Sequence, residues 1–214
     1  IAYNDRKVII VGSHAGVWVG PDGGTHQATE DIAIMRVLPN MAVVVPCDVH
    51  EAYRATLALA ETTSCPTPAY LRLAREKTPV MTLPETEFQI GKAYQMHANN
   101  AAESHNESPC VIFIGCGPIL AEALHAAQEL DTKGYAVEVW NFHTVKPLDS
   151  DALHAISERA TLIVTVEEHQ RAGGLGSAVA EYVTGTNPVR VLRIGINDRF
   201  GQSGTMAELY REYG

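Results

Sequence analysis

The chain has 214 residues, of which 46% are hydrophobic and 19% charged, a composition typical of a globular protein with one large or two small domains. Its formal net charge of −9 argues against a nucleic acid or an anionic membrane as the main partner. We expect neither a signal peptide nor a membrane span, because no apolar run reaches the roughly 20 residues that a span needs.

Apolar runs alternate with helical patterns in the first third of the chain. We expect strands over 7–14, 41–47 and 69–74. We expect helices over 26–38, with Thr25 as N-cap, and over 48–63, with Asp48 as N-cap. The chain opens on Ile1 with the 7–14 strand close behind it, so we expect that sequence is missing upstream and that this strand carries an exposed apolar edge.

The pattern lapses over residues 76–109, which combine prolines with a polar stretch and show neither helical nor strand periodicity. Alternation then resumes. The expected strands are 110–118, 135–143, 161–169 and 188–196, and the expected helices are 119–133, 149–158 and 175–184. This order predicts an α/β chain of two three-layer units with mostly parallel sheets. The predicted boundaries are 1–78, a linker over 79–108, and 109–214.

Polar side chains gather where strands of the first unit end. His14 ends the first strand, Arg75 follows the third, and the loop 20–26 carries Asp22 and His26 among glycines. Ligands collect at the carboxyl ends of parallel strands, so we expect these four side chains to meet at one sheet edge. We place His26 in a first helical turn, where the helix dipole favours a neutral imidazole. Taken singly, each residue is more often structural; together they favour a site.

Two other patterns have structural interpretations. The glycine-rich segment 171–181 looks like a dinucleotide loop, but tight strand-to-helix packing is the favoured interpretation. Glu167, Glu168 and His169, just before it, are candidates for an interface between domains or subunits. The cysteines form no CxxC pair and have no histidine at zinc-ligand spacing, which favours core side chains in a reducing cytoplasm.

The segment SHAGVWVGPDGGTHQATEDIAIMRVLPN closely resembles the pyrimidine-binding domain of transketolases, whose pattern is (T/S)HxxxxxGEDGPTHQ before a helix. PAYLRLARE resembles the strand that bears the family's phosphate-binding arginine. TVKPLD, VEEHQRAGGLGSAVAE and NDRFGQSGTMAELYREYG resemble the C-terminal domain of the same family. The first unit is therefore expected to be a truncated pyrimidine-binding domain, as in the C-terminal subunit of a split transketolase.

The resemblance assigns roles to the four residues. His26 matches the histidine beside the aminopyrimidine and reacting centre of thiamine diphosphate. Asp22 matches the acid that binds a substrate hydroxyl, His14 a histidine that holds substrate, and Arg75 the phosphate-binding arginine. Pro21 and Gly24 replace the usual Glu and Pro, which predicts a differently shaped loop, and Ala74 replaces a Ser found in some members.

The resemblance also implies what lies elsewhere. The glutamate that activates the cofactor precedes the matched region, and Glu30 and Glu51 do not align with it. The motif that holds the diphosphate with Mg²⁺ or Ca²⁺ is absent from this sequence, so a separate diphosphate-binding subunit or domain is expected to supply it. We therefore expect this chain alone to be inactive and to bind thiamine diphosphate weakly, without a metal site of its own.

The function that follows is transfer of a two-carbon ketol unit between phosphosugars, in carbohydrate metabolism of the pentose phosphate type, by a dimer or other homo-oligomer. Three alternatives stay open. They are a 1-deoxyxylulose-5-phosphate synthase-like subunit, a 2-oxoacid dehydrogenase β-like subunit, and a non-catalytic dimerisation module in which the site residues are remnants.

Overall fold

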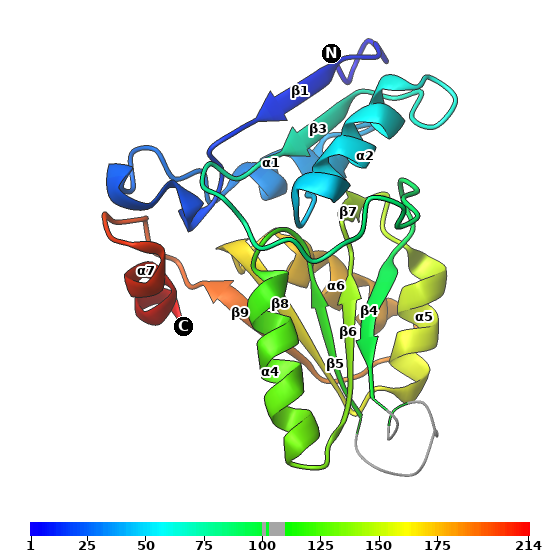
Figure 1. Cartoon of the computed structure of the whole chain (residues 1–214). Coiled ribbons are helices and arrows are strands. Elements are labelled where there is room, and N and C mark those ends of the chain that lie inside the picture. The colour runs from blue at the N-terminus through cyan, green and yellow to red at the C-terminus, as the bar shows by residue number, and fades with distance from the viewer. Residues whose placement is uncertain (100–101, 103–109) are drawn as a thin grey trace.

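The computed structural model of the chain describes residues 1–99, 102 and 110–214. Its strands form two sheets, and Figure 1 shows the first sheet above the second. The first has the strand order β1-β3-β2-β7 and the second β4-β6-β5-β8-β9. The strands are β1 Ile9–Gly12, β2 Ala42–Val44, β3 Ala69–Arg72, β4 Tyr94–Ala98, β5 Cys110–Gly115, β6 Ala136–Asn141, β7 Thr144–Lys146, β8 Leu162–Gln170 and β9 Val191–Ile196.

Helices cover both faces of each sheet. They are the 3₁₀ helix η1 Val17–Asp22 and the α-helices α1 Asp31–Val37, α2 Val49–Ala60, α4 Leu120–Thr132, α5 Ser150–Arg159, α6 Leu175–Gly185 and α7 Met206–Tyr213. Alternation along β5 shows the layering, because successive side chains of a strand point to opposite faces. Ile112 and Ile114 lie in the core cluster that holds residues of α5 and α6, whereas Phe113 packs with residues of α4.

The predicted fold class is confirmed. In the first sheet, β1 and β2 both run parallel to β3, and in the second β5, β6, β8 and β9 are parallel neighbours. β1 lies at the sheet edge, and its Val11 is 54% exposed, as the sequence predicts for an apolar edge strand. Within the described residues, no helix is both long enough and apolar enough to cross a bilayer.

Two strands lie where none is predicted. β4, in the segment expected to lack periodicity, pairs antiparallel with β6, and β7 pairs antiparallel with β2. Both strands form by pairing with a strand that is distant in sequence, so the local pattern of apolar residues does not predict them. β7 also attaches a short strand of the second half to the first sheet. Residues 100, 101 and 103–109, the rest of the predicted linker, lie outside the described residues, and the division at 1–78, 79–108 and 109–214 stays a prediction.

The helix expected over 26–38 begins later, at Asp31, and Glu30 rather than Thr25 takes the N-cap position. The reason is a competing pairing. Ala15 and Ala28 form a parallel β-bridge, and the Gly16 N–H donates to the Ala28 carbonyl at 2.8 Å. The segment before α1 is thus held in a turn and an isolated bridge instead of a first helical turn. The predicted N-cap of α2 is confirmed, because the Asp48 side chain accepts from the Glu51 N–H at 2.9 Å.

His143 follows β6 and is buried, with its ring stacked on Phe88 at 4.2 Å between centroids. Burial, aided by the nearby Arg54 charge, lowers the pKa of His143 to about 4. The imidazole is therefore neutral in the folded protein at a pH where the unfolded chain already binds a proton.

We expect the free energy of unfolding to fall as the pH drops from about 6.5 towards 4, by about 3 kcal/mol from His143 alone. The unfolded state binds the proton first in this range, so acidification favours unfolding. Chemical denaturation at a series of pH values, compared between the wild type and His143→Gln, measures this difference. Replacing the exposed His154 with Gln serves as control. Equal pH dependence in wild type and His143→Gln would contradict the prediction.

Candidate functional site

The candidate site lies at the carboxyl edge of the first sheet. β1 and β3 are paired in parallel with Gly12 opposite Arg72, so both strands end at the same level. His14 comes two residues after Gly12, and Arg75 three residues after Arg72. The Ala15 N–H donates to the Leu73 carbonyl at 3.1 Å, which keeps the two chain segments together beyond the strands. These segments thus lie side by side, as expected of residues that follow the carboxyl ends of neighbouring parallel strands.

Asp22 and Arg75 form the centre of this site. Arg75 Nη1 donates to Asp22 Oδ2 at 2.6 Å and to the Val19 carbonyl at 3.2 Å. The side chains are 39% and 35% exposed, so the pair is open to solvent and to a ligand. Gly20, with φ of 64°, makes the turn inside η1 that presents Asp22 to Arg75, and a positive φ of this kind favours glycine.

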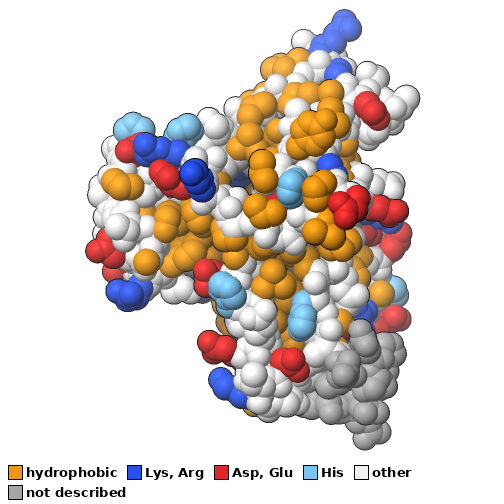
Figure 2. Space-filling view, viewed as in Figure 1, with side chains coloured by type: hydrophobic (Ala, Val, Ile, Leu, Met, Phe, Trp, Pro, Cys, Tyr) orange, Lys and Arg blue, Asp and Glu red, His pale blue; other side chains and the backbone are white. Residues whose placement is uncertain are grey.

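His14 and His26 are exposed on the same loop. Their recorded hydrogen bonds are with their own neighbours: His14 Nδ1 lies 3.0 Å from Ser13 Oγ, and His26 Nδ1 lies 3.0 Å from Thr25 Oγ1. The Ala15–Ala28 bridge places the two segments that carry them next to each other. Figure 2 shows histidine, Lys/Arg and Asp/Glu side chains gathered at the end of the molecule that holds η1.

One expectation for His26 is wrong. The sequence analysis places it in the first turn of a helix, but α1 begins at Asp31, five residues later. The helix dipole acts over the first turn, so it does not reach this imidazole. His26 lies in an exposed glycine loop instead, and its backbone N–H donates to the Gly23 carbonyl at 2.9 Å.

A hollow of about 530 Å³ adjoins Arg75. Arg75, Glu76 and Lys77 line one side of it, and the turn from Pro46 to Val49 lines the other. It lies outside the ends of β2 and β3, where open parallel sheets bind ligands. Its lining carries the cations Arg75 and Lys77 and also the acids Asp48 and Glu76, so the guanidinium of Arg75, and not a net positive charge, is what the hollow offers to an anion.

Arg72, which sequence reasoning missed, anchors the base of the loop. Its buried guanidinium donates from Nε to Asp31 Oδ2 at 2.8 Å, and from Nη2 to the carbonyls of Ala28 at 3.1 Å and Glu168 at 2.9 Å. Asp31 also accepts from Tyr70 at 2.7 Å. The signal was present in the sequence, because an arginine inside a fully buried strand requires a partner.

Glu168 and His169 contact the first half of the chain, as proposed for an interface between domains, whereas Glu167 bonds within the second half. His169 Nε2 accepts from the Ala33 N–H at 3.2 Å, and the Glu168 carbonyl accepts from Arg72. The Glu167 carboxylate accepts from the N–H groups of Leu175 and Gly176 at 2.6 and 2.9 Å. The helix N-terminus of the glycine-rich segment is thereby capped by the chain's own carboxylate, which confirms the packing interpretation over a dinucleotide loop.

The remaining candidates are structural. The four cysteines are free and buried, as expected of core side chains. Glu51 is buried, where it accepts from the Cys47 N–H at 2.7 Å and from Asn141 Nδ2 at 2.8 Å. Within the residues the structure describes, no group of three or more His, Cys, Asp or Glu side chains is placed to hold a metal ion.

Family models match both halves of the chain. The model for the pyrimidine binding domain of transketolase matches residues 1–81, and the model for the transketolase C-terminal domain matches residues 100–214. With its two mostly parallel sheets and the loop between β1 and α1, the chain thus belongs to the transketolase family, whose members depend on thiamine diphosphate.

Within that family, the chain is similar to proteins named as transketolase subunits or sections. A protein from Methanocaldococcus jannaschii, named as a candidate transketolase C-terminal section, is 38% identical over 100% of this chain and 64% of its own length. The 6-deoxy-6-sulfo-D-fructose transketolase subunit of a Clostridium species is 35% identical over 100% of this chain and 63% of its own. The chain thus spans less than two thirds of these relatives.

A solved structure shows the same architecture. The structure described as "Split gene transketolase, inactive beta4 tetramer" superposes with a TM-score of 0.83 at 35% identity, covering 100% of this chain and 64% of that one. The transketolase from Leishmania mexicana gives a TM-score of 0.72 at 25% identity, over 100% of this chain and 29% of that one.

We expect Arg72→Met to lower the free energy of unfolding by about 3–5 kcal/mol, because it leaves the Asp31 carboxylate buried without its cation. Urea denaturation of the full chain measures this loss. Lys92→Met serves as control, since the exposed ammonium of Lys92 pairs with Asp149 and Asp151 in contact with water and its loss is expected to lower the free energy of unfolding much less. Equal losses in the two variants would contradict the anchoring role of Arg72.

Proposed function

We propose that the chain is the C-terminal part of a transketolase that transfers a two-carbon ketol unit between phosphosugars. The observation that carries the proposal is the solvent-open Asp22–Arg75 pair on a loop that also exposes His14 and His26. This set combines groups that exchange protons, read a hydroxyl and bind an anion. A sugar with a terminal phosphate presents those same three features to a protein.

Asp22 and Arg75 divide the recognition of such a sugar. Arg75 uses one nitrogen, Nη1, for Asp22 and the Val19 carbonyl. A guanidinium has five N–H donors. Nε of Arg75 also lies 3.7 Å from Glu76 Oε1, so the donors left to bind a phosphate in the adjoining hollow are those of the two Nη atoms that Asp22 and Val19 do not use. The Asp22 carboxylate accepts from a sugar hydroxyl, and its contact with Arg75 holds it in place for this role.

His26 and His14 act on the oxygens of the substrate. An imidazole donates and accepts protons near neutral pH, which ketol transfer requires at the sugar carbonyl and hydroxyl groups. His26 stands beside the reacting end and His14 towards the phosphate. The glycines at 20, 23 and 24 leave the loop without side chains that would obstruct the approach of a substrate.

The loop fits one side of thiamine diphosphate. When bound, this cofactor supplies the carbon nucleophile that breaks and forms the carbon–carbon bond. The imidazole and carboxylate groups of the loop suit the aminopyrimidine and the sugar. We assign the diphosphate and its Mg²⁺ or Ca²⁺ to a separate diphosphate-binding subunit or domain, which assembles in the cytoplasm with a homo-oligomer of this chain. The similar structure described as a β4 tetramer supports self-association.

The proposal also specifies which terminal anion the sugar carries. One relative is named for a sulfonated sugar, 6-deoxy-6-sulfo-D-fructose. Sulfonate and phosphate are both terminal anions that an arginine binds. We favour phosphate, and a parallel assay with the sulfonated sugar decides between them.

We expect His26→Ala to lower the ketol-transfer rate by about 10²- to 10⁴-fold, the range that general acid–base groups contribute. The assay combines the full chain with its diphosphate-binding partner subunit, thiamine diphosphate and Mg²⁺, using xylulose 5-phosphate as donor. Replacing the exposed His125 of α4 with Ala serves as control. Ketol transfer unchanged in His26→Ala would contradict the role of this histidine. A wild-type assembly without transfer would favour the non-catalytic module.

We expect Arg75→Met to raise KM for the phosphosugar by about ten- to a hundredfold, because a charge-assisted hydrogen bond to the anion is lost. The value of kcat changes less, since the reacting end of the sugar lies away from the phosphate. Steady-state kinetics with the same assembly measures both constants. Arg190→Met, at the opposite end of the second sheet, is the control. A loss confined to kcat would contradict the assignment of Arg75 to the phosphate.

A further inference from the structure

The C-terminal helix α7 lies beside the loop that carries the candidate site. Figure 1 shows α7 next to the 3₁₀ helix η1 of the first half, although Trp18 of η1 and Tyr210 of α7 are 192 residues apart in sequence. Leu209 of α7 is buried with Val17 of η1 and Ile196 at the end of β9. The loop therefore packs against a segment from the other end of the chain.

A chain of hydrogen bonds joins these elements. Trp18 Nε1 of η1 donates to Tyr210 Oη at 2.5 Å, and Tyr210 Oη donates to Glu168 Oε1 at 2.8 Å. The rings of Trp18 and Tyr210 meet edge to face, with centroids 6.2 Å apart. Tyr210 thus uses its hydroxyl both as acceptor and as donor. The two hydrogen bonds connect η1 through α7 to the end of β8.

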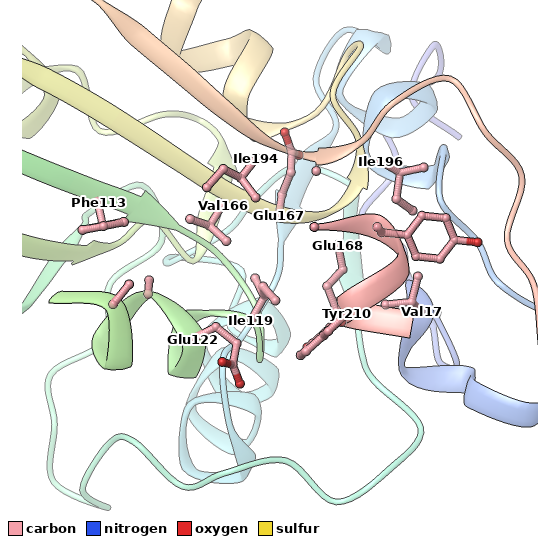
Figure 3. A pocket seen from close by; sticks show the side chains of 15 residues that line it. Val17, Phe113, Ile119, Glu122, Val166, Glu167, Glu168, Ile194, Ile196 and Tyr210 are labelled. Carbon is pink, nitrogen blue, oxygen red and sulfur yellow. The ribbon is translucent and has the colours of Figure 1, made fainter. Parts of the chain in front are cut away.

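Packing alone does not hold Tyr210 in position. Its ring borders an apolar hollow of about 320 Å³ between α4, the ends of β8 and β9, and α7. Figure 3 shows Tyr210 among the side chains that line this hollow, including Val166, Ile194 and Ile119. Packing confines a ring less on the side that faces open space, so the two hydrogen bonds of the hydroxyl add to the contacts with Trp18 and the Leu209 cluster in fixing its position.

The position of Trp18 bears directly on the site. Its neighbour Val19 supplies the carbonyl that accepts from Arg75, and Asp22 lies one turn further along η1. A shift of Trp18 therefore moves one acceptor of Arg75 and the segment that carries the other. The same C-terminal segment makes a second contact, because Gln27 Nε2 donates to the Gln202 carbonyl at 3.1 Å.

We propose that Tyr210 is a positioning residue that holds η1 through Trp18, so that the C-terminal helix sets the geometry of the Asp22–Arg75 pair. The role of the pair in catalysis rests on the proposed function, but the mechanical link does not. Glu168, buried and hydrogen-bonded to Tyr210, fixes the hydroxyl from the second sheet.

Hydrogen–deuterium exchange of the full chain tests the link without any ketol-transfer assay. We expect Tyr210→Phe to speed exchange of the peptide over 17–26 by about tenfold. Tyr213→Phe is the matched control, since Tyr213 lies on the same helix and its hydroxyl donates to the Phe200 carbonyl rather than to η1. Exchange over 17–26 that is unchanged in Tyr210→Phe, or equally fast in Tyr213→Phe, overturns the proposal.

A second variant keeps the test decisive if Tyr210→Phe unfolds. Trp18→Phe removes the other end of the same hydrogen bond and is expected to speed exchange over 17–26 to the same extent. Unchanged exchange over 17–26 in Trp18→Phe overturns the proposal. Where Tyr210→Phe folds, the double variant is expected to add little to the effect of Tyr210→Phe alone, because Tyr210→Phe already breaks the Trp18–Tyr210 hydrogen bond. Additive effects would show that the residues act independently and would overturn the proposal.

Activity then connects the link to the site. In the assembly with the partner subunit, Tyr210→Phe is expected to lower kcat/KM about tenfold while Tyr213→Phe leaves it unchanged. Faster exchange with unchanged kcat/KM would refute the positioning of Asp22 and Arg75. Absence of ketol transfer in every form, wild type included, would count against the proposed function, and the exchange result would still stand.

Discussion

The buried guanidinium of Arg72 is the interaction on which the arrangement of the chain depends. A charge removed from water must find partners of opposite charge or with lone pairs, and here they come from two segments that are distant in sequence, 28–31 and the end of β8. Asp31 at the start of α1, the carbonyl of Ala28 and the carbonyl of Glu168 all accept from it. The end of the first sheet is thereby joined to the end of β8 in the second.

This junction explains why the candidate site forms on an open loop. The loop leaves β1, is tied to the Leu73 carbonyl at Ala15, and returns to the Arg72 junction at Ala28. Between those fixed points the chain turns at glycines and exposes His14, Asp22 and His26. These exposed side chains cover only one side of a bound substrate, so a second surface is needed to enclose it. In the function we propose, a diphosphate-binding partner and its cofactor provide that surface.

Much of the fold could be predicted because its elements are encoded locally. Buried strands such as β5 are continuous apolar runs, and α2 begins at the capping residue Asp48. What escaped prediction depends on contacts between distant segments. β4 and β7 exist because of their pairing with β6 and β2, and α1 begins late because Ala28 pairs with Ala15. Helix α7 was also not predicted, although a local signal was present in the sequence, because Thr205 and Glu208 form a capping box.

The candidate site divides in the same way. The rule that strand ends share one edge predicted that the loop and Arg75 would meet, and Asp22 and Arg75 are in contact. The geometry of His26 was misjudged, because its distance from α1 depends on the Ala15–Ala28 bridge. A buried arginine such as Arg72 signals in the sequence that it needs a partner, but not which one. Its acceptor Glu168, like the Trp18 partner of Tyr210, lies in the other half of the chain and is known only once the two sheets are in place.

The central claim is that the Asp22–Arg75 pair faces the substrate. The most direct measurement is a crystal structure of the chain assembled with its diphosphate-binding partner, thiamine diphosphate and a phosphosugar. We expect the sugar phosphate within hydrogen-bonding distance of Arg75, a sugar hydroxyl hydrogen-bonded to Asp22, and His26 beside the reacting carbon. A sugar bound away from this loop, with all four side chains still in solvent, would contradict it.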